Sequence, residues 1–300
     1  MLYTSYLQVL SSIHGPTLQA SKRIYPPPTP GLTFTAGFAA GALQSVVAAP
    51  LDALQARFRT SDLLEAEAGG PFRSVWQYGR DKLREIGPRG IFSGWSLSFL
   101  KDSFGSGLFF CLFETVKAQG YYAFVKYYYG SLQPQLVEKL SHTRLGGVSS
   151  EGLPQIRPHY ALEPCFLMLG GITASVGQQL VLHPLGQVQA VYYKRLEHLD
   201  QQLTRPSSSS KNPRHQHATT RQLMTYRWEA YRETLRRCER KARRVGGWRA
   251  WLFRGFLGAT VRQVPSTSAG LVIFELVRRK YGAEVEAVHI REDGYEIVLT

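Results

Sequence analysis

Long stretches without charge constrain the fold of this chain more than any other feature. Residues 24–51 contain no charged side chain, and residues 164–193 contain none except a possible charge on His183. A helix needs about 20 consecutive apolar residues to cross a bilayer. Both stretches exceed that length, so the sequence predicts two membrane-spanning helices here.

Two further stretches are apolar apart from a charge near the middle. Residues 91–113 contain only the adjacent pair Lys101–Asp102, and residues 255–274 contain only Arg262. Together the four stretches predict an all-α membrane protein with about four core transmembrane helices and shorter helices between them. On hydropathy alone, four buried helices of a soluble protein are the alternative.

The remaining charge is strongly basic and unevenly distributed. The chain has 36 Lys and Arg against 22 Asp and Glu, which gives a net charge of +14. Residues 194–244 hold 14 basic and 5 acidic side chains, so this region carries +9 of the total. Such an excess indicates an anionic partner: a solute, an anionic lipid surface or a nucleic acid. Charge beside a membrane already explains the basic region, so we expect no nucleic acid.

No feature of the sequence indicates catalysis or a cofactor. The cysteines Cys111, Cys165 and Cys238 lie far apart without metal-ligand spacing, and the eight histidines are scattered. No Ser/His/Asp set or phosphate-binding loop is evident, so we expect no enzyme, metal or cofactor. Neither a secretory signal nor a cleavable transit peptide is evident at the start.

An internal repeat organises the chain. The first element recurs at an offset of 134 residues: Gly37-x-x-x-Gly41 with Pro50-Leu51-Asp52, then Gly171-x-x-x-Ser175 with Pro184-Leu185-Gly186. Small residues at this spacing let helices in lipid approach closely. A second element recurs at an offset of 161: Phe92-Ser93-Gly94 with Phe253-Arg254-Gly255, Lys101 with Arg262, and Phe113-Glu114-x-x-Lys117 with Phe274-Glu275-x-x-Arg278.

The change in offset places 27 extra residues between the two apolar helices of the second copy. This insertion includes Pro206-Ser-Ser-Ser-Ser210, which is loop composition, followed by a basic helical stretch. Each copy therefore reads as an apolar helix, a basic segment with a short amphipathic helix and a second apolar helix. The short helices are expected at Phe72–Glu85 and within Tyr226–Arg244.

The repeat predicts the following division of the chain: an N-terminal segment at 1–31, a first copy at 32–127, a connecting loop at 128–158, a second copy at 159–283 with its basic insertion at 199–245, and a tail at 284–300. Each basic loop joins an odd apolar helix to an even one. Both loops must therefore lie on the same side of the membrane, the side from which positive loops are not translocated.

These motifs resemble the mitochondrial carrier family. Its odd helices end in Pro-x-[Asp/Glu]-x-x-[Lys/Arg]-x-[Lys/Arg], which Pro50-Leu-Asp52-Ala-Leu-Gln55-Ala-Arg57 matches with Gln55 in the first basic slot. The two even-helix motifs, at Phe113–Lys117 and Phe274–Arg278, are full matches. Pro184-Leu-Gly186-Gln-Val-Gln189 is a degraded match without its charges. The resemblance covers about residues 32–119 and 163–280.

The resemblance implies a six-helix bundle of three repeats, of which this chain shows two. We assign them to repeats two and three, and residues 1–31 are a possible remnant of repeat one. The first repeat is either absent, or the chain begins inside it as a truncated copy of a six-helix carrier. The expected fold is thus an incomplete carrier-type helical bundle.

The resemblance also implies where a solute would bind. Lys101 and Arg262 each lie seven residues after a matched glycine, at the depth where the family contacts its substrate. Lys101 with Asp102 would form the second contact site, and Arg262 with Gln263 the third. Two cations facing one cavity suit an anionic solute such as a carboxylate or phosphate. The alternative is that these residues are structural groups of a helix bundle.

Two gates complete the implied mechanism. Pro50 and Pro184 would kink the odd helices. The matrix gate would comprise Pro50, Asp52, Gln55, Pro184 and Gln189. We expect it to be weak, because Asp52 would face the neutral Gln189 and share only a hydrogen bond. The cytoplasmic gate would comprise Glu114, Lys117, Glu275 and Arg278, with helix-end charges at a membrane interface as the alternative.

The expected function is a multi-pass transporter of the mitochondrial inner membrane, or of another organelle membrane, moving a small anionic metabolite by alternating access. The alternative is a carrier-derived scaffold or adaptor that does not transport. An incomplete bundle would expose polar groups to lipid, so a membrane partner or self-association is also possible. Membrane lipids, including anionic ones, are further expected partners.

Overall fold

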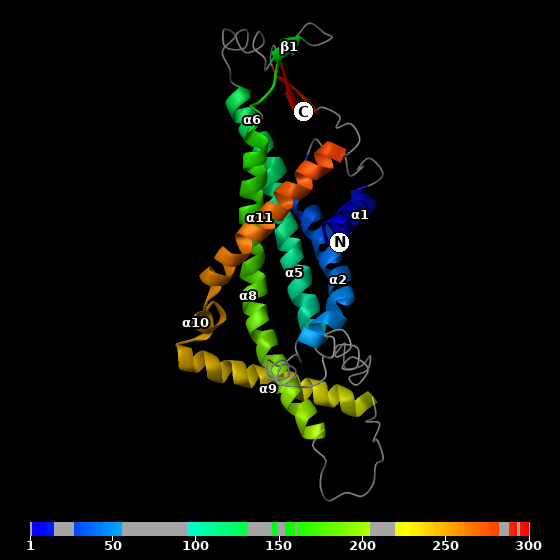
Figure 1. Cartoon of the computed structure of the whole chain (residues 1–300), viewed down its shortest axis with the longest axis vertical. Helices are drawn as coiled ribbons and strands as arrows, with labels where there is room; N and C mark the ends of the chain where they lie inside the picture. The colour runs from blue at the N-terminus through cyan, green and yellow to red at the C-terminus, as the bar shows by residue number, and fades with distance from the viewer. Residues whose placement is uncertain are drawn as a thin grey trace, which may run out of the picture. The chain divides into compact units, whose positions relative to one another are not determined.

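The computed structural model describes residues 2–14, 27–55, 95–130, 146–148, 154–159, 161–204, 220–281, 288–292 and 295–299. Its helices are α1 (Leu2–His14), α2 (Pro30–Gln55), α5 (Trp95–Glu114), η1 (Thr115–Gly120), α6 (Tyr121–Tyr129), α8 (Leu162–Thr204), α9 (Thr220–Val245), α10 (Trp248–Leu252) and α11 (Phe256–Tyr281) (Figure 1). Its strands are β1 (Gly146–Val148), β2 (Pro154–Ile156), β3 (Val288–Glu292) and β4 (Tyr295–Leu299).

The chain forms two compact units, and the long helices α2, α5 and α8 pass from one into the other. Unit 1 comprises Met1–Gly41, Ser103–Leu180 and Leu257–Thr300. Unit 2 comprises Ala42–Asp102 and Val181–Phe256. Each unit has its own apolar core.

Aromatic side chains from α1 and α5 form the core of unit 1. Tyr6 stacks on Phe110 with ring centroids 3.9 Å apart, and Phe109 stacks on Phe113. The buried residues of this core are Tyr6, Leu10, Ala36, Ala40, Phe109, Phe110, Phe113, Leu167 and Ala174. The first part of α2 and the first half of α8 contribute only small residues and one leucine.

Small residues let the helices of unit 1 approach closely. A Cβ atom on Gly37 would lie 2.8 Å from the carbonyl oxygen of Ser106 in α5, and one on Gly171 would lie 3.3 Å from Ser268 in α11. One turn after Gly171, the hydroxyls of Ser175 and Thr267 share a hydrogen bond of 2.5 Å. Close backbone approach with a polar bridge is typical of helices packed in a membrane.

A four-stranded sheet packs against α6 in unit 1. Its order is β1-β2-β4-β3, with β2 and β4 parallel and the outer pairs antiparallel. Ile156, Ile290 and Ile297 pack on Tyr121 and Val125 of α6. The Tyr295 hydroxyl donates a hydrogen bond to the carbonyl of Tyr129, the last residue of α6.

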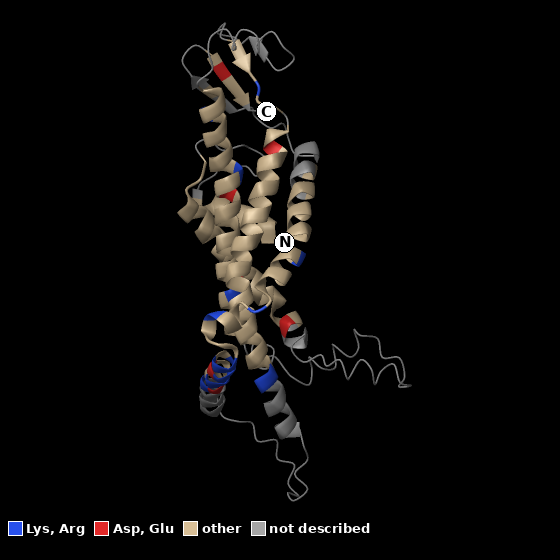
Figure 2. Ribbon diagram, turned by 90° about the vertical axis from the view of Figure 1, so that its left-hand side faces the viewer, with Lys and Arg blue, Asp and Glu red and all other residues tan. Residues whose placement is uncertain are grey.

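Unit 2 is built around α9, which runs across the C-terminal half of α8 in Figure 1 and is seen end-on beside it in Figure 2. Its Cys238 and Ala242 are fully buried against Val191 of α8 and Trp251 of α10. The rings of Tyr231 and Tyr192 stack at 4.7 Å, and Arg195 forms an ion pair of 2.5 Å with Glu233.

All four predicted apolar stretches form helices: α2, α5, α8 and α11. Of the described helices, α2 and α8 have the length and hydropathy to cross a membrane, over Pro30–Ala49 and Leu162–Arg195. The charged and small polar residues of α5 and α11 lower their hydropathy below that of a typical span. The described part of the chain is mostly helical, as predicted for a carrier-type fold.

The structure adds strands and a longer second amphipathic helix to the sequence prediction. The expected connecting loop at 128–158 contains β1 and β2, and the expected tail contains β3 and β4. The second amphipathic helix is longer than predicted, because α9 spans 26 residues. The predicted helix at Phe72–Glu85 lies outside the described residues. Both α2 and α8 continue as helix through Pro50 and Pro184.

Candidate functional site

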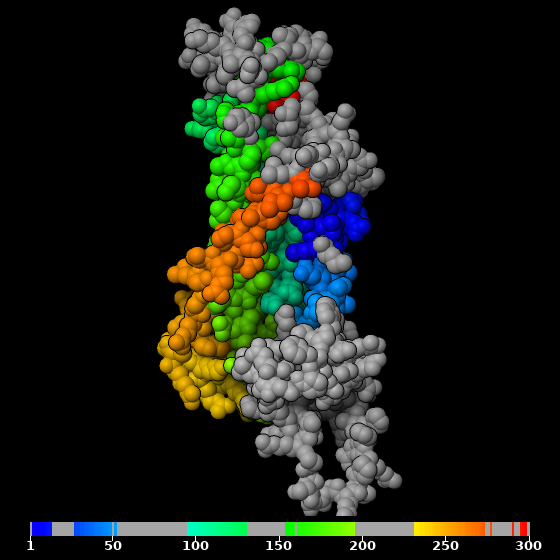
Figure 3. Space-filling view, in the orientation of Figure 1, coloured from blue at the N-terminus to red at the C-terminus, as the bar shows by residue number. Residues whose placement is uncertain are grey.

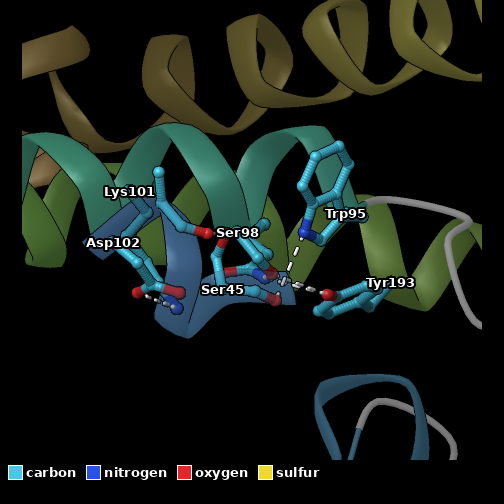
Figure 4. Close-up of polar contacts among 8 residues, drawn as sticks. Ser45, Trp95, Ser98, Lys101, Asp102 and Tyr193 are labelled. Carbon is cyan, nitrogen blue, oxygen red and sulfur yellow. Dashed lines mark hydrogen bonds and ion pairs between the residues drawn. The ribbon is translucent and has the colours of Figure 1, made fainter. Parts of the chain in front are cut away.

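Polar and charged side chains of unit 2 gather on the first two turns of α5 (Figure 4). Ser98 and Lys101 are three residues apart, so they lie on one side of the helix. The Lys101 ammonium is 3.7 Å from the Asp102 carboxylate, and both side chains are about one-fifth exposed, at 21% and 22%. An ion pair this long and this accessible leaves both charges able to bind a solute.

Gln189 of α8 joins this part of α5 through a buried hydrogen-bond cluster. Its side-chain nitrogen donates to the Ser98 hydroxyl at 2.6 Å and to the Tyr193 hydroxyl at 2.9 Å. The Ser98 and Tyr193 hydroxyls are 3.3 Å apart (Figure 4). We call Ser98, Gln189 and Tyr193 the Gln189 cluster. It contains no ionised group.

The cluster corrects the expected hydrogen bond between Asp52 and Gln189. An amide has two N–H donors, and an ionised carboxylate can only accept. Gln189 uses its amide nitrogen on Ser98 and Tyr193, so it has no donor for Asp52. Within the described part of the chain, the buried Oδ2 of Asp52 has no hydrogen-bond partner.

Two aromatic side chains fix the start of α5. The Trp95 indole donates to the backbone carbonyl of Ser45 in α2 at 3.2 Å, and the Ser96 hydroxyl is 2.5 Å from the Tyr231 hydroxyl of α9. Because Trp95 and Ser96 are both bonded to other helices, the first turn of α5, which precedes Lys101, is anchored.

The remaining residues of the predicted matrix gate are only partly described. Pro50 and Gln55 belong to α2, but their side chains lie outside the described residues. Pro184 is half-buried inside α8, one turn and a half before Gln189. The members of the predicted matrix gate whose side chains are described are therefore Asp52, Pro184 and Gln189.

The other predicted contact site belongs to unit 1. Arg262 and Gln263 lie on α11, and both side chains are exposed. The backbone carbonyl of Gln263 accepts a hydrogen bond of 3.1 Å from the Thr267 hydroxyl. Thr267 therefore lies one turn after Gln263 on the same side of α11.

The predicted cytoplasmic gate also falls within unit 1. Glu114 ends α5, and Lys117 lies in the π-helical turn η1 with its ammonium 5.3 Å from the centre of the Phe113 ring. Such a contact is a cation–π interaction. Glu275 and Arg278 belong to α11, but their side chains lie outside the described residues.

The sequence analysis missed Ser98, Tyr193 and Trp95. A signal for two of them was present, because Ser98 precedes Lys101 by one turn and Tyr193 follows Gln189 by one turn. The described arrangement is a helix contact lined by hydroxyls and an amide beside one cation and one carboxylate, groups that can bind a polar solute.

Comparison with known proteins locates one family match. Residues 26–121 match the family described as mitochondrial carrier protein. This range includes α2, α5, Asp52, Lys101 and the motif that ends in Lys117. The predicted second copy lies outside the matched range. No curated protein and no solved structure matches the chain.

Proposed function

We propose, from the match of residues 26–121 to the mitochondrial carrier family, that this chain is a carrier that moves a small anionic metabolite across the mitochondrial inner membrane. Members of this family are transporters rather than enzymes. The coarse function, a carrier-type solute transporter, follows from the family. The anionic solute, the inner membrane and the alternating-access mechanism are our proposal.

The Lys101–Asp102 pair carries the proposal. An ionisable side chain within a membrane helix is costly, so its retention points to a function. The pair is only 21–22% exposed, and its 3.7 Å separation gives a weak internal bond. A carboxylate or phosphate brought to Lys101 gains a stronger, shorter hydrogen bond than Asp102 provides.

Arg262 supports the same proposal from the sequence. It occupies the depth in the second copy that Lys101 occupies in the first, and its guanidinium suits a planar carboxylate or a phosphate. We propose Lys101, Asp102, Arg262 and Gln263 as solute contacts. We propose Glu114, Lys117, Glu275 and Arg278 as the cytoplasmic gate.

The Gln189 cluster suggests how the opposite gate would work. Alternating access requires contacts that close one side of a central site while the other side opens. Here Gln189 would hold α8 against α5 through neutral hydrogen bonds, in place of the inter-repeat ion pairs implied by the resemblance. Neutral bonds are weaker than charge-assisted ones, so this gate would open readily.

Flux measurements with the purified full-length chain in liposomes test the proposal. We expect uptake of at least one member of a panel of carboxylates and phosphates, with Lys101→Ala and Arg262→Ala each lowering flux at least about ten-fold, as for loss of one charge-assisted contact. Lys101→Arg, which keeps the charge, should retain more flux than Lys101→Ala. The exposed Gln44→Ala serves as the control variant.

A folded protein with no flux of any anion would contradict transport. It would instead favour the membrane scaffold, which predicts a stable complex with another membrane protein on native gels. Unchanged flux in both alanine variants would support transport but would contradict the assignment of Lys101 and Arg262 as solute contacts. Fractionation of mitochondria into inner and outer membranes tests the proposed location separately.

A further inference from the structure

The outward face of α9 carries a row of arginines that the proposed transport does not use. Arg232, Arg236 and Arg240 follow one another at one-turn spacing, and Arg243 and Arg244 extend the row. All five side chains are exposed. At about 1.5 Å per residue, the row from Arg232 to Arg244 is roughly 18 Å long. The ribbon of α9 is mostly blue in Figure 2, with a few red positions, and part of its surface is visible in yellow at the lower left of Figure 3.

The opposite face of α9 is fixed, so the arginines cannot rotate toward the protein. Thr234, Cys238 and Ala242 lie on that face and are at most 2% exposed. The stacking of Tyr231 on Tyr192 and the ion pair between Arg195 and Glu233 hold the helix on α8. The outward direction of the row is therefore set by packing.

Few acidic groups neutralise the row. Glu233 is engaged by Arg195 and Arg237, and Glu239 pairs with Arg243 at 2.6 Å. Among the described residues, Arg232, Arg236 and Arg240 form no ion pair with an acid. The row thus keeps a positive charge that attracts a polyanion.

The orientation of α9 identifies the kind of polyanion. Within unit 2, α9 runs across α8 in Figure 1 and is seen end-on beside it in Figure 2, and α8 has the length and hydropathy of a membrane span. A helix perpendicular to a span lies along the membrane plane. Exposed apolar side chains accompany the row: Leu235 on α9, and Trp248 and Phe253 around α10. Basic and large apolar groups together are typical of interfacial helices.

We propose that the row Arg232–Arg236–Arg240–Arg243–Arg244 docks on the phosphates of an anionic phospholipid surface. Guanidinium groups bind phosphates bidentately, and Trp248 and Leu235 would enter the boundary between headgroups and acyl chains. The docking rests on α8 spanning the membrane and not on the identity of the solute. It would hold α9 flat against the interface independently of transport.

Titration of phosphatidylglycerol into the full-length protein in neutral detergent tests the docking. A basic residue near an anionic surface contributes about five-fold to binding, so Arg236→Gln with Arg240→Gln should weaken apparent affinity about 25-fold. The matched control is Lys126→Gln with Arg157→Gln, which removes two exposed charges from unit 1 and should leave affinity unchanged. Arg236→Lys with Arg240→Lys should retain most of the affinity.

Binding of phosphatidylcholine, a lipid without net charge, and of a 20-nucleotide RNA distinguishes docking on anionic lipid from the alternatives. We expect little binding of phosphatidylcholine, and no binding of RNA that depends on Arg236 and Arg240. Equal binding of both lipids, or equal loss in both double variants, would overturn the proposal. RNA binding that is lost in the Arg236/Arg240 variant, without loss of phosphatidylglycerol binding, would assign the row to nucleic acid. Absence of solute flux would not affect these measurements.

Discussion

At the scale of single residues, the Gln189 cluster shows how a neutral amide can join two helices. Gln189 is 6% exposed and Ser98 is 1% exposed, so both polar groups are removed from solvent. Buried polar groups must be hydrogen-bonded, because leaving one unpaired costs more than an average bond contributes. Ser98 and Tyr193 meet that requirement for the amide nitrogen, which makes each of the three residues dependent on the others.

Replacing Gln189 with alanine should therefore destabilise the protein by about 1–3 kcal/mol, since the Ser98 and Tyr193 hydroxyls lose their donor in a buried setting. Thermal or denaturant unfolding in detergent measures the change. The exposed Gln44 lies in the same compact unit, and Gln44→Ala should change stability by less than about 0.5 kcal/mol. Equal effects of the two substitutions would contradict a structural role for the cluster.

Burial should also protect the thiol of Cys238. The side chain is fully buried between α9, α8 and α10, and burial raises the pKa of the thiol. Burial limits access to the thiol, and the raised pKa lowers the fraction that is reactive thiolate near neutral pH. A higher pH is therefore needed to form the thiolate. In a background with Cys111 and Cys165 replaced by serine, Cys238 should react with maleimide at least about ten-fold more slowly before unfolding than after it.

The matched control moves the thiol to the exposed side of the same helix. Arg236→Cys, combined with Cys238→Ser in that background, should react at a similar rate before and after unfolding. The same slow rate at both positions would mean that the reagent does not reach α9 at all, and fast labelling of Cys238 would contradict the packing of α9 on α8.

At the scale of elements, close helix contact depends on glycine. A Cβ atom on Gly37 would lie 2.8 Å from the Ser106 carbonyl oxygen and 3.1 Å from the Gly107 Cα, both backbone atoms that cannot move aside. Gly37→Ala should therefore separate α2 from α5 and destabilise the protein by about 1–3 kcal/mol.

Gly31→Ala is the matched control for Gly37→Ala, because no atom lies within 4 Å of a Cβ there and both residues belong to α2. Alanine favours helix over glycine, so this change should be neutral or stabilising by up to about 1 kcal/mol. Unfolding of both variants in the same detergent gives the comparison. A stable Gly37→Ala protein would show that α2 and α5 are not in backbone contact.

The long helices were predictable from the sequence, whereas the site contacts were not. Uncharged stretches located α2 and α8, and apolar stretches with a charge near the middle located α5 and α11, because a membrane helix needs about 20 mostly apolar residues in sequence. The C-terminal strands were missed, although Asp293-Gly294 between two β-rich segments is a hairpin signal. The partner of Gln189 was predicted wrongly, since residues 91 positions apart meet only through packing.

At the scale of the whole molecule, a chain that spans a membrane presents the two ends of each span to opposite sides. Helix α8 is the clearest case, because it is continuous over 43 residues and its apolar part ends at Arg195. The basic residues that follow it should stay on the side from which the protein is inserted. Arg157 precedes the helix and Lys194 lies near the end of its apolar part, and both side chains are exposed.

Single cysteines at these two positions should consequently react from opposite sides. In a background without native cysteines, an impermeant maleimide added to sealed vesicles of one orientation should label either Arg157→Cys or Lys194→Cys, and both after detergent is added. In vesicles whose outer surface is the side from which the protein is inserted, the labelled variant should be Lys194→Cys. The positive charges that follow α8 oppose translocation and keep this end on that side. Labelling of both variants in sealed vesicles would mean that α8 does not cross the membrane, which would remove the basis for transport and for lipid docking by α9 alike.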